Sequence, residues 1–331
     1  MSWESLWQSR SLASHALLPA SWLYGLAVRA RGAPKATRVE GLTVVSVGNL
    51  IAGGAGKTPV VIFLAEWALR AARRVAIISR GYGRNARHQV QWRGGQPLPA
   101  LADVGDEPGL IARRFASSEN LLLIVDADRI AAARTAREAG CDWAILDDGF
   151  QHRRLHRDVN ILIDAGIGNA RLLPAGPLRE PVTAAARADV IWARDGARAL
   201  VHPPALRVEA IHETTTLLSP DGREVPRATL AGQRVVALAG LARPSGFLAD
   251  LRTSGANVVE THLFPDHHRY SAAELDQVRQ SAVRLHAVVV TTEKDRERLP
   301  EGFEVTQLRM AVRITQGQPA LAARLGLPTH E

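Results

Sequence analysis

The sequence feature that most constrains the fold is the glycine-rich segment 53–58, Gly-Gly-Ala-Gly-Lys-Thr, which lies between a predicted strand and a predicted helix. The preceding run, 42–47, is apolar and rich in β-branched residues, and 58–73 has helical spacing. Pro59 falls near the first helical position, where a missing N–H leaves no helical bond unmade. Glycines at a helix N-terminus let backbone N–H groups surround phosphate oxygens. The segment therefore predicts a phosphate-binding loop.

Each position of this loop has an expected role in nucleotide binding. The expected backbone and side-chain contacts to phosphate come from Gly53, Gly54, Ala55, Gly56, Lys57 and Thr58. Lys57 is expected to reach the β and γ phosphates, and the Thr58 hydroxyl to bind Mg²⁺. The strict phosphate-loop pattern, Gly-x-x-x-x-Gly-Lys-Ser/Thr, has glycine where this chain has Ile51. The loop is therefore closer to the Gly-Gly-x-Gly-Lys-Thr variant. Some ATPases with that variant have lysine at the position of Ala52. A ligand-free glycine turn is the alternative, and the order strand, loop, helix argues against it.

Further apolar runs predict an α/β fold with a mostly parallel sheet of the P-loop NTPase type and helices on both faces. Continuous rather than alternating apolar strands are typical of sheets covered on both sides. Strands are expected at 75–78, 121–125, 143–146 and 159–163, and a helix at 130–139. Periodicity is lost around 194–204, so we expect a P-loop core at 41–200 and a smaller C-terminal α/β domain at 201–331. In that domain we expect strands at 207–218, 235–241, 257–263 and 287–291, and helices at 245–254 and 272–285.

Residues 1–40 form a separate N-terminal segment with an apolar stretch at 16–28. That stretch is shorter than the roughly 20 residues that span a bilayer. A signal peptide would have an early basic region and a small-residue cleavage site. Here Trp3, Glu4 and Trp7 precede the stretch, and a basic cluster follows it at Arg29, Arg31, Lys35 and Arg38. An amphipathic segment at a membrane interface and a helix packed on the protein's own core remain equally open.

Composition narrows the class of protein further. With 331 residues and 46% hydrophobic content, the chain has enough apolar surface for two cores, and disorder is excluded as its main state. A single cysteine, Cys141, indicates a reducing compartment and is expected to be buried. The formal charge is +8, but only three of the 41 basic residues are lysines, two of them Lys57 and Lys294. A lysine kept in an arginine-rich chain suggests a site that needs a compact ammonium group.

Two adjacent acids, Asp147 and Asp148, end the apolar run at 143–146. Acids at the end of a buried strand beside a phosphate loop are typical of a Mg²⁺ site in nucleotide-binding proteins. The alternative is a solvated Asp-Gly turn, which the neighbouring phosphate loop makes less favoured. We therefore predict that Thr58, Asp147 and Asp148 bind the metal.

A series of short motifs extends the pattern over nearly the whole chain. In chain order they are Ser46-Val47-Gly48-Asn49-Leu50, Ser79-Arg80-Gly81-Tyr82-Gly83-Arg84, Val104-Gly105-Asp106-Glu107-Pro108, Leu146-Asp147-Asp148-Gly149-Phe150-Gln151-His152, Leu173-Pro174-Ala175-Gly176-Pro177-Leu178-Arg179-Glu180-Pro181, Phe264-Pro265-Asp266-His267-His268 and Thr291-Thr292-Glu293-Lys294-Asp295. Through these motifs the chain resembles the tetraacyldisaccharide 4'-kinase family of lipid A biosynthesis.

The resemblance implies transfer of the γ-phosphate of ATP, with Mg²⁺, to the 4'-hydroxyl of a glucosamine disaccharide that carries acyl chains and a 1-phosphate. The products would be lipid IVA and ADP. It also implies a peripheral protein at the cytoplasmic face of the inner membrane, whose smaller domain closes the active-site cleft. We expect a monomer that binds an acylated disaccharide lipid and no nucleic acid.

The resemblance also suggests the catalytic residues. The acceptor hydroxyl is assigned to Asp106 and His267, and Arg179 and Glu180 are expected near the reacting groups. Asp106 is expected in a turn before a helix that begins near residue 109. Arg129 is a second candidate, with Arg179, for neutralising phosphate charge, and is assigned to nucleotide binding.

Three alternatives remain open. His268 is the alternative to His267, which is preferred because the motif has histidine directly after aspartate. Lys294 follows a predicted strand, at the place where GTPases have the guanine-reading motif Asn/Thr-Lys-x-Asp. Here Lys294 and Asp295 are adjacent, so the spacing does not fit that motif and ATP is favoured over GTP. The role of Lys294 as a hinge, cleft or substrate contact is left open. A nucleotide-hydrolysing switch would use the same loop without a lipid acceptor, and a nucleic-acid-binding protein would use the basic charge alone.

Overall fold

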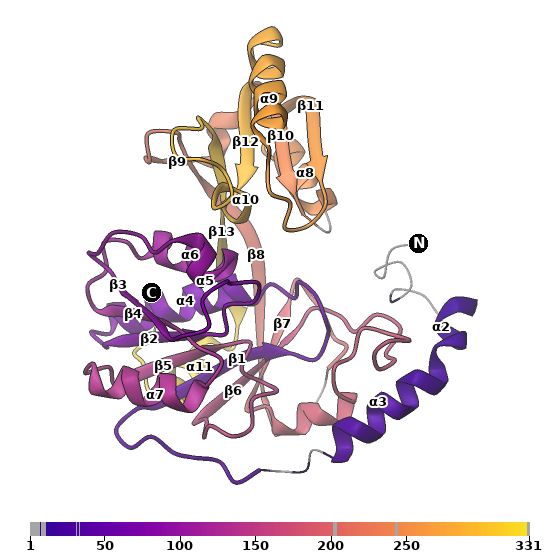
Figure 1. The fold of residues 1–331 in the computed structure, drawn as a ribbon, viewed down its shortest axis with the longest axis vertical. Helices are drawn as coiled ribbons and strands as arrows, with labels where there is room; N and C mark the ends of the chain where they lie inside the picture. Colours follow the sequence, from indigo (N-terminus) through magenta and orange to yellow (C-terminus); the bar gives the residue numbers. More distant parts are fainter. Residues whose placement is uncertain are drawn as a thin grey trace. The chain divides into compact units, whose positions relative to one another are not determined.

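The computed structural model describes residues 7, 11–30, 32, 34–200, 204–241 and 244–329. It divides into two compact units, which Figure 1 draws as ribbons. Unit 1 comprises Met1–His212 and Val312–Glu331, and unit 2 comprises Glu213–Ala311. The expected domain limits, 41–200 and 201–331, are therefore wrong at both ends of the second domain.

Two long strands explain this error. The chain leaves unit 1 within β8 (Leu206–Leu218) and re-enters it within β13 (Thr306–Gln316). Because the strand pattern continues across each boundary, the sequence shows no break at residue 212 or 311. The loss of periodicity near 194–204 marks only a loop before β8.

The sheet of unit 1 has the order β8-β7-β6-β1-β5-β2-β4-β3. Its strands are β1 (Thr43–Asn49), β2 (Val75–Ser79), β3 (Val90–Arg93), β4 (Leu121–Val125), β5 (Trp143–Asp147), β6 (Val159–Asp164), β7 (Val190–Arg194) and the first half of β8. The printed pairs are parallel except for β3, which runs antiparallel to β4. The mostly parallel sheet is confirmed, while β3, β7 and β13 were not predicted.

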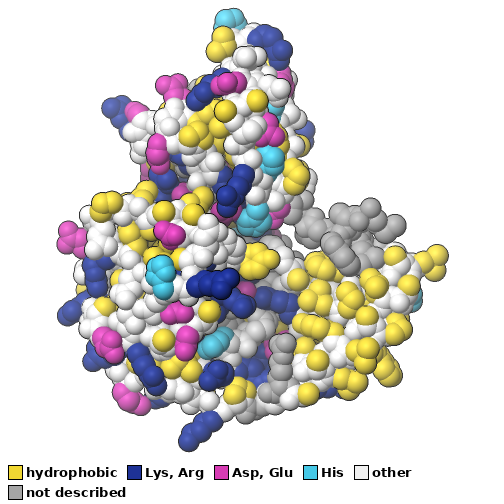
Figure 2. All heavy atoms as spheres, in the orientation of Figure 1, with side chains coloured by type: hydrophobic (Ala, Val, Ile, Leu, Met, Phe, Trp, Pro, Cys, Tyr) yellow, Lys and Arg dark blue, Asp and Glu magenta, His cyan; other side chains and the backbone are white. Residues whose placement is uncertain are grey.

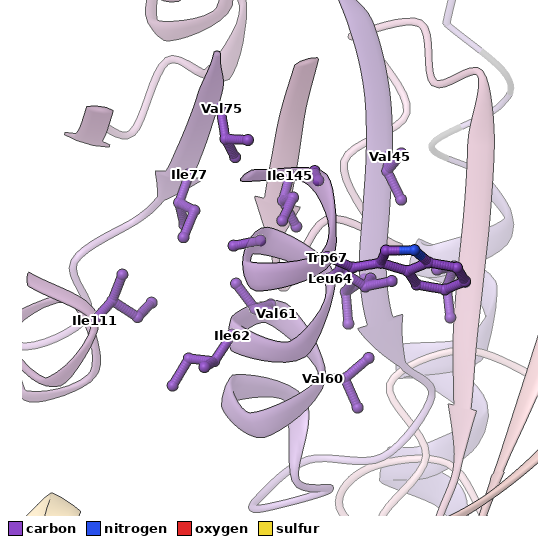
Figure 3. Close-up of a cluster of buried hydrophobic side chains, with 14 of the residues drawn as sticks. Val45, Val60, Val61, Ile62, Leu64, Trp67, Val75, Ile77, Ile111 and Ile145 are labelled. Carbon is purple, nitrogen blue, oxygen red and sulfur yellow. The ribbon is translucent and has the colours of Figure 1, made fainter. Parts of the chain in front are cut away.

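Helices cover both faces of this sheet, as predicted. On one face lie α4 (Lys57–Arg70), α6 (Asp106–Arg114) and α11 (Gln318–Leu325), and on the other lies α7 (Arg129–Glu138). Successive residues of β1 point to opposite faces, so Val44 belongs to one core and Val45 to the other. Figure 3 shows the core that contains Val45, in which Leu64 and Trp67 of α4 pack against the sheet.

Unit 1 contains further helices. They are α2 (Leu12–Ala16), α3 (Leu18–Ala30), α5 (Leu101–Val104) and the 3₁₀ helix η1 (Val182–Arg187). No helix in the described ranges has the length and apolar character needed to cross a membrane. Cys141 is buried, as expected.

Unit 2 is a second α/β layer structure with the strand order β11-β10-β12-β13-β8, and β9 pairs with β8. Its remaining elements are β9 (Glu224–Pro226), η2 (Arg227–Leu230), β10 (Arg234–Gly240), α8 (Pro244–Thr253), β11 (Asn257–Phe264), α9 (Ala272–Arg284), β12 (Val288–Thr292) and α10 (Glu293–Arg296). Phe247 of α8 packs in one core and Val278 of α9 in another, so helices again lie on two faces. The elements expected between 207 and 291 are each found within two residues of the predicted limits.

Candidate active site

The phosphate loop connects β1 to α4 and has the open geometry that a bound phosphate needs. Gly53 and Gly56 have positive φ angles of 98° and 76°, which side-chain-bearing residues rarely adopt. A Cβ atom added at Gly53 or Gly54 would meet no atom within 4 Å, so the space beside these two glycines is open. Gly56 precedes α4 without a side-chain cap, which leaves the first amides of the helix to a ligand. The loop therefore fits a nucleotide phosphate.

Lys57 and Arg179 both contact the Asp148 carboxylate. Lys57 Nζ lies 3.5 Å from Asp148 Oδ1. Arg179 forms two parallel hydrogen bonds, from its two Nη atoms to the two carboxylate oxygens, each 2.9 Å long. A bidentate guanidinium–carboxylate pair fixes orientation as well as charge. Three predicted site residues from distant parts of the chain are thus brought together.

The backbone at Asp148 has an unusual conformation that places this partly buried residue beside the loop. Asp148 has φ +52°, a left-handed conformation that costs a side-chain-bearing residue roughly 1–3 kcal/mol. Gly149 follows with no room for a side chain, because a Cβ there would lie 2.6 Å from Leu146 Cβ. At Gly48, on the neighbouring strand, a Cβ would lie 2.6 Å from Phe150 Cβ. Close packing of β1 against the 148–150 turn therefore holds Asp148 in this conformation.

The two adjacent acids have opposite electrostatic environments. Burial raises the pKa of Asp147 to about 7, and the charges of Glu107 and Asp148 act in the same direction. For Asp148, burial alone would raise the pKa, but the hydrogen bonds from Arg179 and the charge of Lys57 outweigh it and lower the pKa to about 2. Asp148 is therefore the permanent anion, and Asp147 is the acid whose charge depends on a nearby cation.

Asp147 is the better-supported candidate for a metal ligand. Its Oδ2 accepts a hydrogen bond from Ser79 Oγ at 3.1 Å, and its Oδ1 is buried without a hydrogen-bond partner among the described groups. A divalent cation would both pair with this oxygen and remove the electrostatic penalty of ionising the acid. Mg²⁺ binds through one or two carboxylates plus substrate oxygens, so Asp147, Asp148 and the hydroxyl of Thr58 form a suitable donor set.

Arg179 is held by more than Asp148. One guanidinium nitrogen also donates to the Asn49 carbonyl at 3.3 Å and contacts the Asn49 side-chain oxygen. Its backbone N–H donates to Leu50 O at 2.7 Å, beside the start of the phosphate loop. Glu180 is buried and pairs instead with Arg187, whose guanidinium lies over the Phe150 ring. The Arg179 side chain therefore contacts Asp148, whereas the Glu180 side chain contacts Arg187.

Arg129 is the first residue of α7 and is 7% exposed, so it is not a surface arginine. Its Nη1 donates to Ala127 O at 3.1 Å. Burial and the charge of Arg80 lower its pKa, while Asp148 and Asp147 oppose that change. The same arginine helps burial lower the pKa of His152 to about 4, so this histidine is neutral at physiological pH. Arg129 therefore has a buried charge within electrostatic range of the acid pair.

Sequence reasoning did not assign two residues that contact this site, Asn49 and Ser79. Together with the predicted Asp147, they are the last residues of β1, β2 and β5. Carboxyl ends of neighbouring parallel strands meet at one edge of a sheet, which is where α/β folds bind ligands. The motifs containing Asn49 and Ser79 were recognised, and their positions at strand ends are the signal that could have assigned them to the site.

Asp106 begins α6 rather than lying in an exposed turn, which corrects the expectation that the helix starts near residue 109. It follows Gly105, whose φ is +89°, and is half-buried. Asp106 and Glu107 both lie in the first helical turn, where the partial positive charge of a helix N-terminus favours carboxylates. Pro108 in the same turn is tolerated because no helical N–H bond is lost there.

In unit 2, the two candidate histidines have different surroundings. His267 is about half exposed and has φ +59°, and its Nε2 lies 3.4 Å from Lys294 Nζ. Lys294 also forms a 2.9 Å ion pair with Asp266. His268 stacks on Phe264 and hydrogen-bonds Glu274 at 3.1 Å, so it is committed to the structure of the turn. His267 is therefore the more exposed of the two histidines, and His268 the one held by neighbouring side chains.

Comparison with known proteins finds similarity to one family of kinases over nearly the whole chain. The family model described as tetraacyldisaccharide-1-P 4'-kinase matches residues 13–326. A tetraacyldisaccharide 4'-kinase of Anaeromyxobacter dehalogenans is 42% identical over 320 residues, covering 89% of this chain and 84% of its own length. One from Geobacter sulfurreducens is 40% identical over 302 residues, with 87% and 84% coverage. The crystal structure of LpxK from Aquifex aeolicus in complex with ATP has a TM-score of 0.80 and 31% identity, and covers 95% of this chain and 99% of that one.

Proposed function

Because the chain belongs to the tetraacyldisaccharide-1-phosphate 4'-kinase family, we propose that it transfers the γ-phosphoryl group of ATP to the 4'-hydroxyl of the tetraacyl glucosamine disaccharide 1-phosphate. The products are ADP and lipid IVA. The observation that carries this proposal is the contact of both Lys57 and Arg179 with Asp148, beside an open phosphate loop. A site built this way neutralises transferring phosphate and needs no covalent nucleophile.

Charge neutralisation is the main work of these residues. In a loose phosphoryl-transfer transition state, negative charge is spread over the equatorial and leaving oxygens. Lys57 contributes a compact ammonium group and Arg179 a planar guanidinium, both already oriented by Asp148. Asp147, Asp148 and Thr58 would hold Mg²⁺, which would supply further positive charge to the phosphate oxygens. Arg129 adds a buried positive charge for the nucleotide.

Proton removal from the acceptor is assigned to Asp106, with His267 as its partner. The 4'-hydroxyl gives its proton to Asp106, its oxygen bonds to the γ-phosphorus, and the bond from phosphorus to the ADP oxygen breaks. Support for Asp106 comes from its half-buried position in the first turn of α6, directly after Gly105. Support for His267 comes from its exposed ring and from the commitment of His268 to Glu274. Glu180 acts through Arg187 as a positioning residue for the Arg179 segment.

The decisive experiment follows γ-³²P from ATP to the purified disaccharide lipid precursor. Label on the lipid, with release of ADP in equal amount, is expected. Release of inorganic phosphate without labelled lipid would instead support the nucleotide-hydrolysing switch. A salt-sensitive complex with DNA or RNA, and no lipid labelling, would support the nucleic-acid-binding alternative.

We also propose that the protein is a peripheral monomer at the cytoplasmic face of the inner membrane, with α2 and α3 at the lipid surface. The outer face of these helices is apolar, and Figure 2 shows hydrophobic side chains gathered over them. Trp22 is 79% exposed and Leu23 70%, and Leu12 and Leu26 are exposed too. Surface patches of this kind mark membrane or protein contacts, and aromatic and basic flanks favour a lipid interface.

Replacing Trp22 and Leu23 with serine tests this membrane contact. We expect weaker binding to vesicles that contain anionic lipid and a higher KM for the lipid acceptor, with little change in the KM for ATP. Unchanged vesicle binding would contradict the lipid contact. Light scattering in detergent measures the expected monomeric mass.

A further inference from the structure

Helix α3 is connected to the segment that carries Arg179 by side-chain hydrogen bonds. The Tyr24 hydroxyl donates to Arg179 O at 2.9 Å. The Ser21 hydroxyl donates to Leu173 O at 3.1 Å and also contacts Leu172 O. From α2, the Ser14 hydroxyl donates to Ala175 O at 2.6 Å. Three hydroxyl groups on one face of the N-terminal helices therefore hold the backbone of 172–179.

The same segment contacts the phosphate loop on its other side. Ala52 N donates to Pro177 O at 2.7 Å, and Arg179 N donates to Leu50 O at 2.7 Å. Ile51 and Leu178 also form an isolated β-bridge. Residues 172–179 thus lie between α3 and the start of the phosphate loop, and Arg179 has backbone bonds in both directions.

The two faces of α3 are reversed from those of an ordinary surface helix, in which apolar residues face the protein. Its buried residues are Ser21 and Gly25, and Tyr24 is half-buried, whereas Trp22, Leu23 and Leu26 are exposed. Gly25 permits close approach, since a Cβ there would lie 2.9 Å from Leu172 Cδ1. Apolar packing is not directional, but hydrogen bonds are, so this face fixes the segment at particular carbonyls.

We propose that α3 positions Arg179 through Tyr24, and that Tyr24 is a positioning residue for phosphoryl transfer. This inference rests on the proposed role of Arg179 in neutralising transition-state charge. The Tyr24 bond fixes the Arg179 carbonyl on the α3 side, while the Leu50 bond fixes its N–H on the phosphate-loop side. With both peptide groups fixed, the guanidinium is held in register with Asp148, where it makes its two 2.9 Å bonds.

Replacing Tyr24 with phenylalanine removes one hydroxyl and keeps the ring. A hydrogen bond contributes about 0.5–1.5 kcal/mol net, so we expect kcat to fall about two- to tenfold. The KM values for ATP and lipid should change little, because the apolar face and the phosphate loop are intact. Hydrogen exchange at the Arg179 amide should become faster. In an Arg179→Lys background, Tyr24→Phe should cause no further loss, because both changes act on one interaction.

The matched control is Thr229→Val, which also removes one hydroxyl-to-carbonyl hydrogen bond, from Thr229 Oγ1 to Pro226 O, but in unit 2. It should leave kcat and exchange at Arg179 unchanged. Faster exchange in Tyr24→Phe with normal kcat, or a loss that adds to that of Arg179→Lys, would overturn the inference. Full activity of Arg179→Ala would overturn the role of Arg179 itself and this inference with it. Loss of activity in Arg179→Ala beside a fully active Tyr24→Phe would overturn the inference alone.

Discussion

The charged groups of unit 1 and those of unit 2 are held in different ways. In unit 1, Lys57 and Arg179 form ion pairs with Asp148, and the adjacent Asp147 is buried. In unit 2 His267, Asp266 and Lys294 lie at the surface, and the buried acid is Asp295, behind them. Asp295 accepts hydrogen bonds from Gly240 N at 3.0 Å and the Tyr270 hydroxyl at 2.9 Å. The charged groups of the unit 1 site are thus buried or partly buried, whereas His267 and Asp266 of unit 2 are exposed and the buried Asp295 bonds to other residues of that unit.

This difference suggests a division of labour. Buried charges act in a low dielectric, where each is worth more and its removal leaves a partner unpaired. Exposed ion pairs are screened by water and contribute about 0–1 kcal/mol. Substitutions in the unit 1 cluster should therefore have large effects, and substitutions in the unit 2 turn should have large effects only at a residue that reacts.

The largest expected effect is at the unit 1 cluster. Lys57→Ala and Asp148→Ala should each lower kcat by roughly 10³-fold, since one preorganised charge donor is worth about 10²–10³ and each change also frees its partner. Circular dichroism should show an intact fold. Lys57→Arg should also be poor, because a guanidinium cannot replace a compact ammonium in the loop. Near-normal turnover of Lys57→Arg would contradict this argument.

The second prediction tests whether an exposed unit 2 residue takes part in the chemistry. Asp106→Ala and His267→Ala should each lower kcat about 10²–10⁴-fold, the range of general acid–base catalysis, with little change in KM. If the two act together, the double variant should be scarcely worse than the more damaged single one. His268→Ala is the control. Additive losses, or a greater loss in His268→Ala, would exclude the Asp106–His267 pair.

The third prediction uses the acidity of Asp147. With its pKa raised to about 7 by burial, Asp147 is protonated below that pH and must lose the proton to bind Mg²⁺. The apparent Mg²⁺ affinity should therefore fall about tenfold for each pH unit below 7, measured by calorimetry with a non-hydrolysable ATP analogue. Asp148, with a pKa of about 2, stays ionised throughout. An apparent Mg²⁺ affinity that does not change between about pH 5.5 and about pH 7 would mean that Asp147 is not the titrating ligand.

Folding stability should show the reverse dependence in the absence of metal. Between its ordinary pKa of 3.8 and about 7, the folded state keeps a proton on Asp147 that the unfolded state has lost. The contribution of this group to the free energy of unfolding therefore falls as pH rises through that window. Asp147→Asn should remove this dependence, which chemical denaturation at several pH values measures.

The smallest expected effect is at Lys294, which contacts Asp266 and His267. Because a partly exposed ion pair is worth at most about 1 kcal/mol, Lys294→Met should lower kcat no more than about fivefold. Lys294→Arg should restore most of the loss, since Asp266 can still pair with a cation. A loss comparable to that of His267→Ala would mean that Lys294 contacts substrate directly.

Much of this arrangement could be predicted because it depends on local sequence. The phosphate loop, α4 and β1 follow from one stretch of glycines between two apolar patterns. The acids of β5 follow from their place at a strand end. Missed strands had weaker signals: β3 has four residues, and β7 immediately precedes the irregular segment that we took as a domain boundary.

Other features depend on contacts between distant residues and could not be predicted from local patterns. The division of the acid pair into a titrating Asp147 and a permanently charged Asp148 depends on Arg179, 31 residues away in sequence. The burial of Arg129 and the structural role of His268 depend on neighbours brought close by folding. For the N-terminal segment the two expectations were not exclusive, because α3 packs on the protein through hydroxyl groups and still exposes its apolar side chains.

The insertion of unit 2 into unit 1 has a consequence for synthesis on the ribosome. Leu321, Ala322 and Leu325 of α11 belong to the same core as α4, and Trp67 Nε1 donates to Pro328 O at 2.8 Å. The core around the phosphate loop is therefore incomplete until the last part of the chain has emerged. Unit 2 is continuous in sequence and can fold earlier, because domains fold as units during synthesis. Throughout translation of 213–311, the nascent nucleotide-binding unit has an uncovered apolar face that is open to chaperones.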